Sequence, residues 1–186
     1  MGKIVAAINM TIDGFCDHEG MSPDEQIHDH YKKLLDDCEV VLYGRKTFGL
    51  MEYWRPFVEH PTGEKSMDEF AATMDKTPKI VFSKTMQNSD WKSASLADES
   101  LEKTVSELKQ KPSKDVLVCS RSLIVQLTNL DLIDEFQLCV HPVIVGKGLP
   151  LFDEINDRTV FELLKSHTFD SGAILLFYKR KASEKT

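Results

Sequence analysis

The stretch Leu132–Phe152, LIDEFQLCVHPVIVGKGLPLF, combines a long apolar pattern with two prolines and two glycines. Phe136–Val145 is predicted to form a strand. Pro142 inside it indicates an edge position or a bulge, because proline lacks the N–H that a sheet ladder uses. The glycines of Gly146–Gly148 favour a tight exit turn. A lysine between two glycines is reminiscent of a phosphate loop, but Pro150 closes the segment and no helix follows to supply free N–H groups. We therefore interpret the stretch as a strand and its exit, with a solvated lysine.

Outward from this stretch, short apolar runs alternate with helical patterns. Further strands are predicted at Lys3–Ile8, Glu39–Tyr43, Lys79–Phe82 and Val116–Cys119. Ser22 as N-cap and Pro23 at the first helical position predict a helix that continues to Asp37. Other helices are predicted at Arg45–Trp54, Met67–Met74, Leu101–Lys111 and Ser122–Asn129. The chain then closes with an antiparallel hairpin, Val160–Phe169 and Ala173–Tyr178, because a three-residue link cannot hold a crossover helix.

This order predicts an α/β fold with an antiparallel edge. Residues 1–181 are expected to form a single domain, because the chain shows no linker or internal repeat, and residues 182–186 a frayed tail. The 30 acidic and 23 basic residues give a formal charge of −7, which argues against nucleic-acid and anionic-membrane partners. No signal peptide or membrane span is recognisable, and four scattered cysteines without a CxxC pair favour reduced thiols and a cytoplasmic location.

Metal chemistry is not indicated. His28-Asp29-His30 looks like a ligand set, but residues two apart do not share a helix face, so two solvated histidines are expected. The chain also lacks the HExxH spacing and paired cysteines of zinc sites.

Three strand-to-helix or strand-to-loop junctions each carry a cation. They are Gly44–Thr47 (GRKT), Ser83–Thr85 (SKT) and Ser120–Ser122 (SRS). Helix starts offer free N–H groups and a positive dipole end, and cations beside them strengthen an anion site. Ser83–Thr85 places an ammonium between two hydroxyls, which suits the 2′-phosphate of NADP. No single junction is specific, but three at the carboxyl ends of strands match what a dinucleotide needs.

Together with MTIDGF (Met10–Phe15), these motifs and the Leu132–Phe152 stretch resemble the dihydrofolate reductase-like superfamily. The chain is most similar to stand-alone proteins related to the reductase domain of the bifunctional riboflavin-biosynthesis deaminase–reductase. The resemblance spans nearly the whole chain. It implies a mostly parallel sheet of about eight strands flanked by helices, and NADPH as cofactor. It also implies a homodimer.

By this resemblance, the cofactor phosphates meet Gly44, Arg45, Lys46 and Thr47, the 2′-phosphate meets Ser83, Lys84 and Thr85, and the pyrophosphate meets Ser120, Arg121 and Ser122. Gly14, together with Asp13, lies in the loop that covers the nicotinamide. Asp13, Asp24 and Glu25 are candidate proton donors, with a bound water as the alternative. Trp54, Arg55 and His141 are candidate substrate contacts.

The chain departs from the family pattern in three places. Cys119 stands where many relatives have glycine, so a Cβ there is expected to narrow the phosphate cradle. The HxE and PCxxC motifs of a zinc deaminase are missing, which excludes deamination. Arg55 alone stands where the bifunctional enzyme has a basic, aspartate-containing segment that grips ribose phosphate.

The implied activity is hydride transfer from NADPH to a carbonyl or imine of a small heterocyclic or sugar-like substrate, as in 5-amino-6-(5-phosphoribosylamino)uracil reductase. Two alternatives stay open. One is a dihydrofolate- or pterin-type reductase, and the other is a non-catalytic NADPH- or antifolate-binding protein of the same fold.

Overall fold

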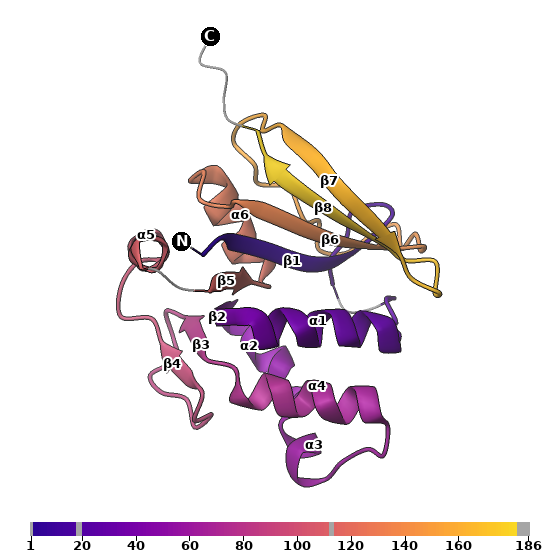
Figure 1. The fold of residues 1–186 in the computed structure, drawn as a ribbon. Coiled ribbons are helices and arrows are strands. Elements are labelled where there is room, and N and C mark those ends of the chain that lie inside the picture. Colours follow the sequence, from indigo (N-terminus) through magenta and orange to yellow (C-terminus); the bar gives the residue numbers. More distant parts are fainter. Residues whose placement is uncertain (1, 18–19, 112–113, 182–186) are drawn as a thin grey trace.

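The computed structural model describes residues 2–17, 20–111 and 114–181, and in these ranges it contains an eight-stranded sheet. The strand order is β4-β3-β2-β5-β1-β6-β8-β7 (Figure 1). The strands are β1 (Ile4–Thr11), β2 (Cys38–Gly44), β3 (Lys79–Phe82), β4 (Ala94–Leu96), β5 (Asp115–Val118), β6 (Glu135–His141), β7 (Phe161–Thr168) and β8 (Ile174–Arg180). Pairing is parallel from β4 to β6 and antiparallel for β6-β8 and β8-β7. The predicted α/β fold, a mostly parallel sheet with a C-terminal antiparallel hairpin, is confirmed.

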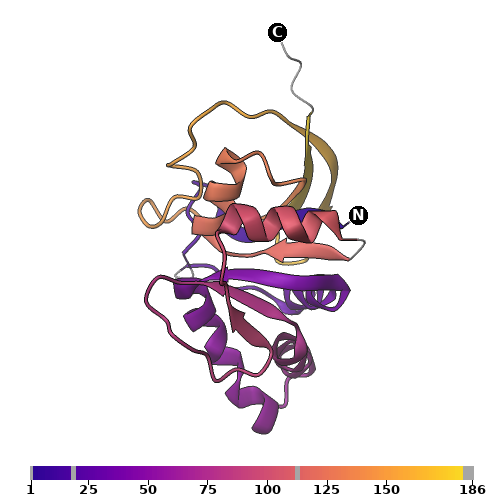
Figure 2. The ribbon, with the colours of Figure 1, turned by 90° about the vertical axis from the view of Figure 1, so that its left-hand side faces the viewer.

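Helices cover both faces of the sheet. They are α1 (Glu25–Asp37), α2 (Arg45–Met51), α3 (Pro56–Glu59), α4 (Lys65–Lys76), α5 (Leu101–Gln110) and α6 (Arg121–Asn129), with a 3₁₀ turn at Glu52–Trp54. The two layers of helices lie on opposite sides of the sheet (Figure 2). Side chains of β1 alternate between two core clusters: Ile4 and Ala6 pack with α5 and α6, and Val5 and Ala7 pack with α1 and α4. A strand buried on both faces needs the continuous apolar sequence that β1 has.

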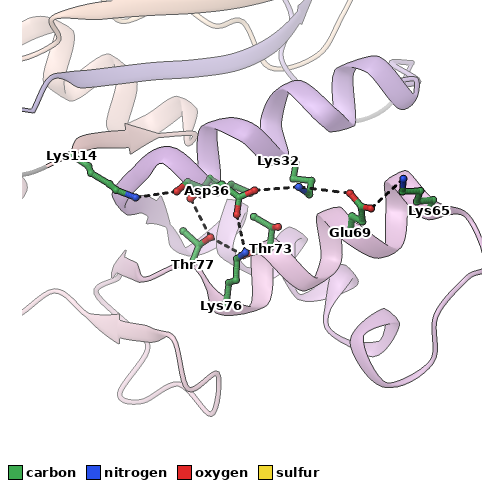
Figure 3. Close-up of polar contacts among 9 residues, drawn as sticks. Lys32, Asp36, Lys65, Glu69, Thr73, Lys76, Thr77 and Lys114 are labelled. Atoms are coloured by element: carbon green, nitrogen blue, oxygen red, sulfur yellow. Dashed lines mark hydrogen bonds and ion pairs between the residues drawn. The ribbon is translucent and has the colours of Figure 1, made fainter.

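Ion pairs join α1 to α4 along their exposed side (Figure 3). Asp36 on α1 lies 2.9 Å from Lys76 Nζ and 3.3 Å from Lys32 Nζ, and Lys32 reaches Glu69 on α4 at 3.7 Å. Lys114, just before β5, donates to the Asp36 carbonyl at 3.3 Å. Each exposed pair contributes roughly 0–1 kcal/mol, so the apolar contacts between the helices and the sheet dominate the stability.

Three local predictions were wrong, each for a physical reason. α1 begins at Glu25 rather than near Ser22, because the Asp24 carboxylate accepts a hydrogen bond from Ile27 N at 2.9 Å and caps the helix. β6 ends at His141 instead of continuing to Val145. It is also an inner strand between β1 and β8, so Pro142 marks the end of the strand and not an edge or a bulge within it. β4 was missed because ASL is short and has no apolar run.

Candidate functional site

A groove of about 650 Å³ lies at the carboxyl ends of β2, β3 and β5. Parallel neighbours bring their carboxyl ends to the same edge of the sheet, so junctions far apart in sequence meet there. The predicted residues that line it are Gly44, Arg45, Lys46, Thr47, Ser83, Lys84, Arg121 and Ser122. Thr85, Ser120 and Gly14, also predicted, are not among its lining residues. The three cationic junctions are therefore parts of one site.

The β2–α2 and β5–α6 junctions, which both line the groove, approach each other closely at Gly44. Gly44 N donates to the buried Ser120 Oγ at 2.8 Å. A Cβ on Gly44 would stand 3.0 Å from Ser122 Oγ, whereas the Gly44 φ of −78° suits any residue. Glycine at this position thus serves the contact between the two junctions and not an unusual backbone conformation. Ser120, which is predicted to cradle pyrophosphate, also holds the two junctions together through this hydrogen bond.

The cations of the groove differ in what they contact. Among the described residues, Arg45, Lys46 and Lys84 form no ion pair, and all three are exposed. Arg121 Nε donates to Pro150 O at 3.0 Å, its Nη1 lies 2.9 Å from Glu154 Oε1, and its Nη2 pairs with Asp153. The positive charge available to an anion therefore comes mainly from Arg45, Lys46 and Lys84.

Asp13 lies in the loop after β1 and is bound to the exit of β6. Its carboxylate accepts hydrogen bonds from Gly146 N at 2.7 Å, Val145 N at 3.2 Å and the Thr11 hydroxyl at 2.6 Å. The Thr11 hydroxyl has the largest effect and lowers the pKa of Asp13. Desolvation opposes it, and the N–H groups of Gly146 and Val145 lower the pKa further. The glycine-lysine-glycine turn thus binds a carboxylate of the chain itself, and Asp13 is a carboxylate at neutral pH.

Asp17 strengthens the same contact. Its carboxylate accepts from Leu149 N at 2.7 Å, and a Cβ on Gly148 would overlap it. Backbone bonds from Cys16 N to Leu149 O and from Leu151 N to Gly14 O, both 2.9 Å, join the two segments further. Residues 11–17 and 143–151 consequently form one connected unit beside the groove, which Leu149 borders.

Asp24, a predicted proton donor, is the N-cap of α1. Burial acts to raise its pKa, but the Ile27 N–H, hydrogen bonds from Ser171 and the charge of His28 outweigh this and lower it. Glu25 follows it on the exposed side of the first turn. Neither Asp24 nor Glu25 lines the cationic groove.

His141 is buried at the end of β6, opposite the end of β1. Its Nε2 lies 3.1 Å from Asn9 Oδ1 and 3.8 Å from Cys139 Sγ. Burial lowers the pKa of His141, although the charge of Asp24 acts in the opposite direction. Asn9, which sequence reasoning missed, is a polar residue at the end of an apolar strand, and that position was the available signal.

Trp54 and Arg55 lie away from the groove. The Trp54 ring packs edge-on against Phe70 at 4.6 Å and against His28 at 5.6 Å. Arg55 Nη1 lies 2.8 Å from Asp90, and its guanidinium lies over the Trp91 ring. Both predicted substrate residues thus take part in packing, and Arg55 is ion-paired.

The expectation of two solvated histidines was wrong. His28 is half-buried against Trp54 and Phe70, and burial lowers its pKa. The His30 ring packs against Phe169 and Phe177, and burial lowers its pKa to about 4. Within the described residues, no group of three or more potential ligands could hold a metal ion.

Cys119 does not narrow the groove. It packs with the core cluster on the α1 and α4 face of the sheet, whereas the groove residues Leu101 and Leu123 belong to the opposite face. Side chains alternate along a strand, so this Cβ points away from the junction of β5 with α6. Burial raises the pKa of the Cys119 thiol, which keeps it protonated.

Across the described ranges, no helix combines the length and apolarity that a membrane crossing requires. Solved structures share the fold, and two of them are compared with this chain. A pyrimidine reductase-like protein from Corynebacterium diphtheriae superposes with a TM-score of 0.65 at 14% identity, covering 98% of this chain and 93% of that one. A Thermotoga maritima diaminohydroxyphosphoribosylaminopyrimidine deaminase/5-amino-6-(5-phosphoribosylamino)uracil reductase gives 0.67 at 18%, covering 97% of this chain and 57% of that one.

Sequence similarity shows the family. The uncharacterized Bacillus subtilis (strain 168) protein YyaP is 34% identical over 180 residues, which is 95% of this chain and 94% of YyaP. Residues 2–175 match the family described as the RibD C-terminal domain. The chain therefore belongs to the RibD C-terminal domain family.

Proposed function

We propose that the protein is an NADPH-dependent reductase that transfers a hydride to a carbonyl or imine of a small heterocyclic or sugar-like substrate. The observation that carries this proposal is the groove in which Arg45, Lys46 and Lys84 lie without an ion pair among the described residues. Such unbalanced positive charge at strand ends suits an anionic dinucleotide. The structurally similar Thermotoga maritima protein is named as a reductase of a phosphoribosylaminouracil, which supports the reaction class.

The residues fit a phosphorylated dinucleotide. Arg45, Lys46 and Thr47 open α2 and would hold phosphate oxygens, and the start of α6 lies beside them across Gly44. Ser83, Lys84 and Thr85 would bind the 2′-phosphate, with Lys84 supplying the charge that separates NADPH from NADH. The cofactor would supply the hydride, and the chain must orient it and exclude water.

Asp13 and Asp24 would act as carboxylates and not as proton donors. Their pKa values are lowered, so both are ionised at neutral pH. We propose that Asp13 fixes the loop over the reacting end of the groove through Gly146, and that Asp24 accepts a hydrogen bond from a substrate N–H. A bound water, on its own or held by Glu25, would then deliver the proton, and His141, whose pKa is lowered, would offer a neutral imidazole to the substrate.

One observation favours a second candidate, a pterin-type reductase. Arg55, the cation expected to grip a ribose phosphate, is paired with Asp90 and Glu52. A substrate without a phosphate would not need this arginine. A non-catalytic NADPH- or antifolate-binding protein is the third candidate.

We also propose a cytoplasmic homodimer. The four cysteines are free thiols, which is usual in a reducing compartment. β7 is an edge strand that exposes Leu163 and Leu164, 50% and 46% accessible, and a second copy could cover it. Sedimentation velocity would test the dimer, and a monomer at all concentrations would contradict it.

The activity test is NADPH oxidation with matched substrates. Purified protein would be assayed with a phosphoribosyl aminopyrimidine, its dephosphorylated form, and a dihydropterin. Turnover of the phosphorylated compound alone would support the riboflavin-type reductase, and turnover of the pterin would support the second candidate. NADPH binding without turnover of any of the three compounds would favour the binding protein.

A further inference from the structure

Arg121 is the one groove cation, among the described residues, that carboxylates of the chain itself surround. Asp153 and Glu154, from the segment after β6, both pair with its guanidinium. Two carboxylates against one guanidinium leave this group with a net negative charge. In this arrangement Arg121 attracts a phosphate much less than the unpaired Arg45 and Lys46 do.

The two sides of this contact differ in exposure to solvent. The Arg121 side chain is 13% exposed and is held by the hydrogen bond from its Nε to Pro150 O. The acidic side chains are 42% and 68% exposed for Asp153 and Glu154. A carboxylate at the surface can rotate into water at low cost, whereas the arginine is already positioned. A phosphate can therefore replace the carboxylates without moving Arg121.

The backbone that carries the acids stays close to the arginine. Leu151 is fully buried, its N–H donates to Gly14 O at 2.9 Å, and Asn129 Nδ2 donates to Glu154 O at 2.9 Å. The acids are thus tethered beside Arg121 at a high effective concentration. They form a built-in competitor for any anion that approaches this side of the groove.

We propose that Asp153 and Glu154 set the affinity of the groove by competing with a ligand phosphate for Arg121. The proposal rests on the proposed function only in taking the groove as a nucleotide site. It assigns a role to two acids outside the groove that the sequence motifs did not include. It also makes Arg121 a group that exchanges its carboxylate partners for a phosphate when the ligand binds.

Calorimetric titrations with inorganic pyrophosphate and with NADPH test this. The variants are D153N/E154Q, R121Q and the triple variant R121Q/D153N/E154Q. The matched control is D131N/E162Q, which changes net charge equally and breaks the pairs with Arg180 and Lys179. We expect D153N/E154Q to bind both probes about threefold to tenfold more tightly, as a strengthened charge-assisted contact implies. The control should bind like the wild type, and the triple variant no more tightly than R121Q.

Other outcomes overturn the proposal. If D153N/E154Q binds the two probes no more tightly than the wild type does, the acids support Arg121 instead of competing for it. Equal tightening in the control means a general charge effect, and failure of both probes to bind D153N/E154Q also refutes the competition. If the double variant is unstable, E154Q alone serves, because Glu154 is the more exposed of the two acids.

Tighter pyrophosphate binding without any NADPH binding would support the competition for Arg121 and contradict the proposed function. Normal NADPH binding that the double variant does not improve would do the reverse.

Discussion

The β2–α2 and β5–α6 junctions share one local plan but use their arginines differently. In each, a parallel strand leads to a small N-cap residue, Gly44 or Ser120, and an arginine opens the helix that follows. Arg45 is exposed and forms no ion pair within the described residues, whereas Arg121 is bound by Pro150, Asp153 and Glu154. The same motif thus leaves its arginine exposed and without an ion pair among the described residues in one place, and holds the chain together in the other.

The largest expected effect concerns the bond that joins the junctions. Ser120→Ala removes the acceptor of Gly44 N and leaves a buried N–H without its partner. We expect the free energy of unfolding to fall by roughly 1–3 kcal/mol. Chemical denaturation measures it, with S122A, at an exposed neighbour, as the matched control. A loss no greater than that of the control would mean that this bond does not join the two junctions.

The charge variants separate the two arginines directly. We expect Arg45→Gln to weaken NADPH binding about tenfold without lowering the melting temperature, since its guanidinium contacts no carboxylate in the described chain. Arg121→Gln should weaken binding only about threefold but lower the stability by about 1 kcal/mol, because it releases the segment at Pro150. Fluorescence titration and thermal melts of both variants check this. If Arg45→Gln and Arg121→Gln change NADPH affinity and melting temperature equally, the two junctions do not use their arginines differently.

A smaller effect is expected where Gly44 of the β2–α2 junction approaches Ser122 of the β5–α6 junction. Gly44→Ala places a Cβ 3.0 Å from Ser122 Oγ, a tight contact that this side chain must relieve by a small shift. We expect NADPH binding to weaken about threefold, and the free energy of unfolding to fall by less than about 1 kcal/mol. G44A/S122A removes the atom that the new Cβ meets and should bind NADPH as tightly as S122A alone. Failure of this rescue would show that the glycine serves a contact other than Ser122.

The smallest effect is pH-dependent. The pKa of Asp13 is lowered in the folded chain, so the folded state binds fewer protons than the unfolded one near the ordinary pKa of about 4. Its stabilisation is therefore present above that pKa and lost as the pH falls through the folded value. Melting temperatures from about pH 6 to about pH 3 should fall less for D13N than for the wild type. An identical fall would argue that Asp13 does not hold the turn at Gly146.

The sequence predicted the parts of the fold and the groove that depend on local pattern. Apolar runs gave most of the strands, and the topology of parallel neighbours then brought Gly44–Thr47, Ser83 and Lys84 together. This could be anticipated because the carboxyl ends of parallel strands share one edge. β4 was missed because a three-residue strand without an apolar run has no periodic signal.

The contacts that decide the use of each side chain were not predictable. Arg121 pairs with Glu154, which is 33 positions away in the sequence, and Asp13 accepts a hydrogen bond from Gly146, which is 133 positions away. Both residues belong to motifs that also suit a ligand. The motif alone therefore cannot show whether the side chain binds a ligand or another residue of the chain. His141 and Asn9, 132 positions apart, meet only because β1 and β6 pair in that register.

The most direct test of the central claim compares NADPH with NADH at Lys84. Dissociation constants for both nucleotides would be measured by calorimetry on the wild type and on Lys84→Ala, with Lys92→Ala, an exposed lysine outside the groove, as control. We expect K84A to weaken NADPH about tenfold to a hundredfold, as a hydrogen bond to a charged phosphate implies, and NADH by less than about twofold. Equal loss for both nucleotides, or a wild type that binds neither, would contradict the assignment of this groove to NADPH.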